Sequence, residues 1–209
     1  MYKLFFTMIL CLSALAAPSL TLSAQQNEKK EHNHFKVYKN DYTFSTVFEF
    51  MSDKQQFGSV VSSSIHLFRT HYDLYTRYGE FEGQGICKIL CLGVFYVWGT
   101  EINLWDYEGN YFGFIDGQVM TTEPAKFSFY NKFGDKMAIA YMDENAQGFS
   151  VVHPNNSAFV LARLTRKFVQ DAPDHWDVAV YEPEYIHPDY IKIFAAFACD
   201  KQSHFKADK

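Results

Sequence analysis

The residues Asp174, His175 and Asp177 place an imidazole between two carboxylates, which are residue types that general acid–base catalysis uses. In an extended strand the side chains of His175 and Asp177 point to the same side, so that the carboxylate can orient the ring. The sequence contains no G-x-S-x-G, H-E-x-x-H or C-x-x-C motif to accompany them. Trp176 and Val178 alternate with these residues and favour a core-facing strand. We therefore assign no catalytic residue, and a hydrolase centred on His175 is kept only as an alternative.

Carboxylates in the same stretch are suitable oxygen ligands for Ca²⁺. The candidate metal ligands are Asp171, Asp174 and Asp177. The stretch lacks the regular ligand spacing and the glycine of an EF-hand loop. A solvated acidic strand explains the same residues without a metal. We therefore expect no cofactor and keep Ca²⁺ as the alternative.

Arg163, Arg166 and Lys167 form a basic cluster on a predicted strand. Alternation places Arg163 and Lys167 on one face and Arg166 on the other. These three residues are the candidate ligand-binding residues, for a phosphate-bearing group. The competing interpretation is that they are solvated charges that discourage pairing at a strand edge.

Composition and cysteine usage exclude some classes of protein. The formal net charge of −5 provides no general electrostatic attraction for nucleic acid, so no nucleic-acid partner is expected. Three cysteines follow the N-terminal apolar segment: Cys87, Cys91 and Cys199. An odd number does not make a disulfide framework. Cys87 and Cys91 lie about 13 Å apart in an extended strand, too far for a bridge, so buried thiols are the better interpretation.

The first 24 residues have the pattern of a secretory signal peptide. Lys3 supplies the positive charge, residues 4–17 are apolar, and Ala24 precedes the favoured cleavage position. The alternative is an uncleaved anchor, but the apolar run is short for a membrane span. We therefore expect export to the periplasm or the extracellular space. Residues 25–40 are mostly polar and are predicted to form a flexible leader.

From residue 42 onward apolar residues alternate with polar ones, the pattern of half-buried strands. Turn signals such as Asp116-Gly117 and Gln147-Gly148 separate the runs. Short strands with turns at this spacing predict an antiparallel meander that closes into a barrel or sandwich. The predicted strands are 42–50, 59–68, 72–78, 86–98, 101–107, 111–119, 126–130, 137–143, 149–153, 158–169 and 176–181.

Residues 189–200 are predicted to form one helix, with Asp189 as its cap. Between residues 190 and 199 only Lys192 interrupts the apolar character, and a helix that is apolar on all sides belongs inside a protein. Its length of about 18 Å is well short of a bilayer core of about 30 Å. We predict a core helix and not a membrane anchor. The expected core residues are Ile191, Phe194, Ala195, Phe197 and Ala198.

Three segments, NLWDYEGNYFGFIDG, KFSFYNKFGDKMAIAYMD and WDVAVYEPEYIHPDYIKIFAAFACDK, resemble the tubby C-terminal-like superfamily. The branch most similar to this chain is the one related to LURP-one and the phospholipid scramblases. The resemblance implies a mainly β fold, a closed antiparallel barrel of about twelve strands around a central hydrophobic C-terminal helix. The barrel would comprise residues 41–203 and leave a polar tail at 204–209.

The chain departs from the pattern of that superfamily in ways that limit the function that the resemblance implies. The basic residues with which tubby proteins bind phosphoinositides have no obvious match, and the proline-rich and cysteine-rich segments of scramblases are missing. A barrel filled by a helix has no ligand cavity, so any site lies on the outer face, the rims or the loops. We expect an exported, non-enzymatic binding or structural domain; the sequence does not identify its ligand or partner, and a protein and a lipid headgroup are the candidates. The alternative is a scramblase-like or phosphoinositide-binding protein that acts at a membrane surface with the help of calcium.

Overall fold

The computed structural model describes residues 33–63, 69–91, 98–118, 124–167, 175–203 and 205. All described strands and the helix belong to one compact unit, His34–Lys209. The proposed signal peptide, residues 25–32 of the proposed leader, Asp171 and Asp174 lie outside the described residues.

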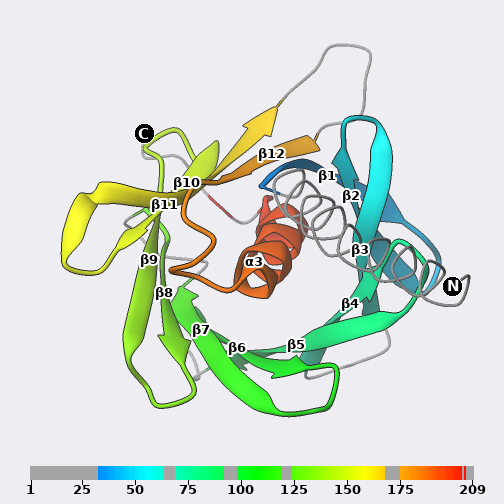
Figure 1. The fold of residues 1–209 in the computed structure, drawn as a ribbon, viewed down its shortest axis with the longest axis horizontal. Coiled ribbons are helices and arrows are strands. Elements are labelled where there is room, and N and C mark those ends of the chain that lie inside the picture. Colours follow the sequence, from blue (N-terminus) through cyan, green and yellow to red (C-terminus); the bar gives the residue numbers. More distant parts are fainter. Residues whose placement is uncertain are drawn as a thin grey trace, which may run out of the picture. The chain divides into compact units, whose positions relative to one another are not determined.

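Twelve antiparallel strands form a closed barrel in which neighbours along the chain are neighbours in the sheet (Figure 1). This confirms the predicted fold class. Its strands are β1 (His34–Asp41), β2 (Ser45–Ser52), β3 (Gln55–Ser63), β4 (Arg69–Thr76), β5 (Phe81–Cys91), β6 (Trp98–Asp106), β7 (Tyr111–Gln118), β8 (Lys126–Asn131), β9 (Lys136–Met142), β10 (Gly148–His153), β11 (Asn156–Lys167) and β12 (His175–Val180).

Strand β1 closes the barrel by pairing with β2 on one side and β12 on the other. The predicted flexible leader of residues 25–40 is therefore wrong from residue 34 onward. Phe35 and Val37 point into the core and are buried, whereas Lys36 and Tyr38 lie on the outer face. The alternation in this strand includes only two inward apolar residues, Phe35 and Val37, which is too short a pattern to predict a strand from the sequence.

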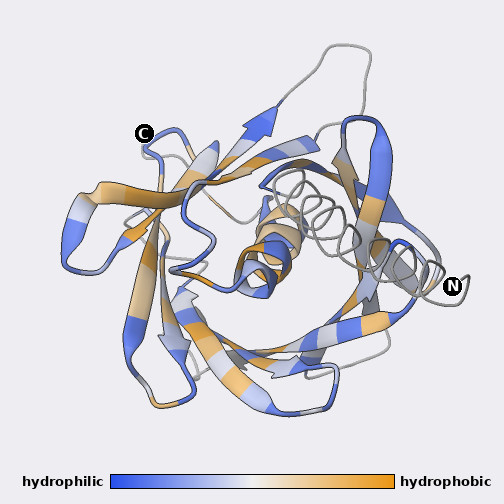
Figure 2. Ribbon diagram, viewed as in Figure 1, coloured by the Kyte–Doolittle hydropathy of each residue, from blue (hydrophilic) through white to orange (hydrophobic). Residues whose placement is uncertain are grey.

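Successive side chains along a strand point alternately to the outer and the inner face of the barrel, and hydropathy alternates along the strands as well (Figure 2). In β2 the residues Phe48 and Phe50 are fully buried, as the period-two pattern predicts. The same pattern fails at Tyr42 and Phe44, which precede β2 and are exposed. Inward aromatic and aliphatic side chains thus meet at the barrel axis.

Helix α3 (Pro188–Lys201) lies on this axis (Figure 1). It begins earlier than predicted, because the cap is His187: its imidazole Nδ1 accepts a hydrogen bond from the backbone N–H of Asp189. Pro188 at the first helical position costs the helix no hydrogen bond, because the N–H that proline lacks would have no partner within the helix. The predicted core residues Ile191, Phe194, Ala195, Phe197 and Ala198 are all fully buried.

The interior of the barrel is packed around this helix, as predicted. The ring of Phe194 lies 5.3 Å from that of Phe127, 5.2 Å from that of Phe129 and 5.2 Å from that of Phe149, centre to centre. The helix and sheet approach so closely that a Cβ on Gly85 would lie 2.7 Å from a methyl carbon of Ile193. Side chains that pack against the helix therefore fill the inner surface of the barrel.

Polar groups fix both ends of α3 to the barrel wall. At its start, the Tyr190 hydroxyl donates to the backbone carbonyls of Phe112 and Tyr130, an either-or pair since it carries one proton. Lys192 forms ion pairs with Glu82 on β5 and with Asp189. At its end, the Tyr72 hydroxyl donates to Asp200 at 2.9 Å. These contacts set the depth and rotation of the helix.

Three further predictions concern the ends and the thiols. Cys87 and Cys199 are buried and free, as expected, while the side chain of Cys91 lies outside the description. The predicted polar tail is wrong at Phe205, which is 8% exposed and packs edge to face on Phe149. Within the described part of the chain, no helix is long and apolar enough to cross a bilayer.

Candidate functional site

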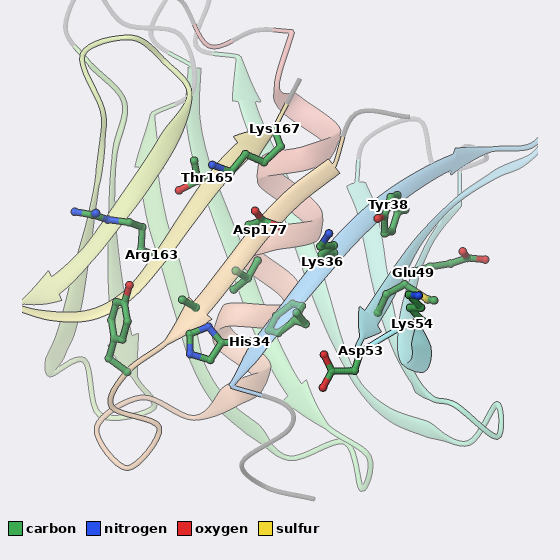
Figure 3. Close-up of a pocket in the computed structure, with 15 residues that line it drawn as sticks. His34, Lys36, Tyr38, Glu49, Asp53, Lys54, Arg163, Thr165, Lys167 and Asp177 are labelled. Carbon is green, nitrogen blue, oxygen red and sulfur yellow. The ribbon is translucent and has the colours of Figure 1, made fainter. Parts of the chain in front are cut away.

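An open groove of about 810 Å³ runs along the outer face where β2, β1, β12 and β11 lie side by side (Figure 3). Both polar and apolar side chains line it. They are His34, Phe35, Lys36, Tyr38, Glu49, Met51, Asp53, Lys54, Arg163, Thr165, Lys167, Asp177, Val178, Ala179 and Tyr181.

The strand register places the polar groups in rows across the groove. Thr165 of β11 is opposite Asp177 of β12, which in turn is opposite Lys36 of β1. The next row aligns Lys167, His175 and Tyr38 in the same order. Arg163, Thr165 and Lys167 alternate along β11, so their side chains leave the same face about 6.8 Å apart.

The cations of the groove have no charged partner in the part of the chain that the structure describes. Among the described residues, the ion pairs and cation–π contacts include none of Lys36, Lys54, Arg163 and Lys167. The lining carboxylates, apart from Asp177, belong to the β2 side, so β11 forms a cationic wall. Long flexible cations beside a hydroxyl are suited to holding an oxyanion such as phosphate.

His175 and Asp177 share a face, as the alternation predicts. The imidazole Nε2 lies 3.4 Å from Oδ1 of Asp177, and the ring stacks on Tyr38 at 5.2 Å between centres. Tyr38 and Asp177 together hold the imidazole ring of His175 in one orientation. His175 is only 8% exposed, which restricts access of a substrate to its nitrogens. The arrangement therefore suits a residue that positions Asp177 at the edge of the groove.

The structure separates the predicted site residues. Arg163 and Lys167 line the groove together, whereas Arg166 is opposite the inward-facing Trp176 and has a buried Nε. Of the predicted metal ligands, only Asp177 is described. Across the described ranges, no group of three or more histidine, cysteine, aspartate or glutamate side chains is placed to hold a metal ion.

Sequence reasoning missed the contribution of β1, namely His34, Lys36 and Tyr38. Their alternation with Phe35 and Val37 is the signal that could have found them. The register with β12 cannot be read from the sequence, because the two strands lie at opposite ends of the barrel unit in the chain. The β11 cations and Lys36 therefore become one site only in the closed fold.

No protein-family model and no curated protein matches the chain. What defines the class of this protein is thus its architecture, a closed twelve-stranded antiparallel barrel around one C-terminal helix.

Proposed function

We propose that this protein is an exported, non-enzymatic binding domain of the tubby/LURP-one type, and that its outer groove binds a phosphate-bearing ligand. The observation that carries the proposal is the cationic wall of β11, completed by Lys36 across Asp177. The packed interior supports an outer site, because it leaves no room for a ligand around the helix. A phosphate above Thr165 would be within reach of the Arg163 guanidinium and the Lys167 ammonium.

The ligand can be a lipid headgroup or a free phosphate compound, since both present the same oxyanion. Binding of inorganic phosphate and of a soluble inositol phosphate is measured by calorimetry. Flotation with vesicles of phosphatidylcholine alone, or with added phosphoinositide, then distinguishes the two sources. Running the flotation with and without Ca²⁺ tests whether a scramblase-like, calcium-assisted attachment applies.

Arg163→Ala and Lys167→Ala each remove one charge-assisted hydrogen bond, worth about 1.5–3 kcal/mol, so each is expected to weaken binding roughly tenfold or more. Arg69→Ala is the matched control, because Arg69 is an exposed arginine on β4 that does not line the groove. Asp177→Asn should strengthen phosphate binding, since it removes a negative charge from the site. Binding that is unchanged in Arg163→Ala, or weakened equally in Arg69→Ala, would exclude the groove.

A further inference from the structure

Three hairpins of the barrel end in the same five-residue turn. These turns are Thr76–Glu80, Asp106–Asn110 and Asn131–Asp135. In each turn the first side chain accepts hydrogen bonds from the backbone N–H groups two and four residues later. The fourth residue is a glycine with φ between 80° and 85°, a conformation that favours glycine. The turns are therefore rigidly built, and their central side chains face outward.

Each of these turns exposes one aromatic ring. Tyr78 is 73% exposed, Tyr107 is 66% exposed and Phe133 is 79% exposed. Rings this exposed contribute little to the packing of the core. Two more exposed rings, Tyr181 and Tyr185, lie between β12 and α3. We call the set Tyr78, Tyr107, Phe133, Tyr181 and Tyr185 the aromatic rim.

The meander places the whole aromatic rim at one end of the barrel, the end at which α3 begins. The hairpins β4–β5, β6–β7 and β8–β9 all turn there, because every second connection of an up-and-down barrel lies at the same end (Figure 1). Successive turns are two strands apart, which corresponds to about 10 Å along the rim. The three turn rings thus follow one another along the same end of the barrel.

Charges beside the rings indicate what the aromatic rim can bind. Arg77 lies over the ring of Tyr78 at 4.5 Å, and Lys132 lies 5.2 Å from the centre of Phe133. Two rings of the rim thus already have a cation of the chain beside them. The positive charge is attracted to the negative face of the ring, and this attraction stabilises the pair.

The other rings of the rim have carboxylates next to them in the chain, and Tyr181 also makes an edge contact with His34, as Tyr185 does with His153 and Phe159. Tyr107 is followed by Glu108 and donates to it at 3.0 Å, and Glu182 and Glu184 lie between Tyr181 and Tyr185. Among the described residues no cation lies over these three rings. Backbone N–H groups of the Asp106–Asn110 turn lower the pKa of the Asp106 carboxyl, so this carboxylate is ionised at neutral pH.

We propose that the aromatic rim is a docking surface for a lysine- or arginine-rich segment of a partner protein. Basic side chains of the partner lie over Tyr107, Tyr181 and Tyr185 as Arg77 lies over Tyr78, and the adjacent glutamates neutralise them. A protein partner fits better than an anionic membrane, because the open rings are flanked by carboxylates that an anionic lipid surface would repel. The aromatic rim shares only Tyr181 with the phosphate groove, which otherwise lies on the side of the barrel, and neither rim variant tested below alters that residue.

The test measures binding of the full-length protein to a fluorescent octalysine peptide, with the fully acetylated peptide as the uncharged probe. The variant Tyr107→Leu/Tyr185→Leu keeps the charge and removes two rings, and it is expected to weaken octalysine binding at least fivefold. Glu108→Gln/Glu182→Gln/Glu184→Gln is expected to weaken it at least tenfold. Acetylation should abolish binding to the unaltered protein. Phe44→Leu is the matched control, since Phe44 is an exposed ring at the opposite end and should leave binding unchanged.

Several outcomes would overturn the proposal. The absence of octalysine binding would do so, as would equal weakening by the rim variants and by Phe44→Leu. An unchanged affinity in Tyr107→Leu/Tyr185→Leu would reduce the interaction to general charge attraction and also refute it. If instead the same variant lost flotation with phosphatidylcholine vesicles while octalysine did not bind, the rim would be a membrane contact. Thermal unfolding of each variant verifies that the barrel is intact.

Discussion

Phe194 offers the most direct test of the packed interior, because it is fully buried and contacts three rings from strands β8 and β10 and one from its own helix. Phe194→Ala removes the ring and leaves a cavity at the barrel axis. A buried Phe→Ala change lowers the free energy of unfolding by about 3–5 kcal/mol. The four ring contacts place this site toward the upper end of that range.

Urea denaturation followed by tryptophan fluorescence measures the effect. With a slope of about 2 kcal/mol/M, a loss of about 4 kcal/mol lowers the urea midpoint by roughly 2 M. Phe133→Ala is the matched control, since it makes the same chemical change at a turn where the ring is exposed; it should cost less than about 1 kcal/mol. A loss below about 1 kcal/mol in Phe194→Ala, or equal losses in both variants, would refute the central position of the helix.

Other predictions concern charge and reactivity. Ala196→Asp should yield no soluble folded protein, because it places an unpaired charge where the side chain is fully buried; a soluble variant that unfolds cooperatively would contradict this. Burial raises the pKa of Cys87 and of Cys199 to about 12, so a thiol reagent should label neither until urea unfolds the protein, with the labelled peptides identified by mass spectrometry. Burial, and then the charge of Glu101 opposite it, raise the pKa of Asp116. The folded state therefore holds the proton more tightly, and stability falls as pH rises from the unfolded pKa near 3.9 through the folded one. Asp116→Asn should unfold at a higher temperature than the unaltered protein at pH 7 and at nearly the same temperature near pH 3.5; an equal difference at both values would refute the assignment.

Much of the fold could be predicted because alternation and turn residues are local signals. The run 111–119 corresponds to β7 within one residue, and the run 101–107 corresponds to β6, which begins three residues earlier and ends one residue earlier. Helix α3 was predicted to within one residue at each end, because its apolar character on all sides is unusual. The cap was misassigned, since both His187 and Asp189 carry acceptors and only the backbone path decides between them.

Less of the site could be predicted, because it depends on contacts between distant segments. Arg163 and Lys167 were identified as a pair from spacing alone, and the structure places both in the groove. The opposing Lys36 was assigned to the leader, because only Phe35 and Val37 marked its strand. The aromatic rim was missed for a similar reason: its turns become one surface only through the up-and-down order of the strands.

The pairing of the first strand with the last also has a kinetic consequence. The barrel closes only when β1 meets β12, and the helix that fills it follows β12 in the chain. During synthesis from the N-terminus, most of the sheet must exist before its core is available, with an exposed apolar concave surface and two unpaired edges. Folding is therefore expected to be slow and to depend on contacts between residues far apart in sequence. A chain of this design would benefit from holding chaperones until its last segment has emerged.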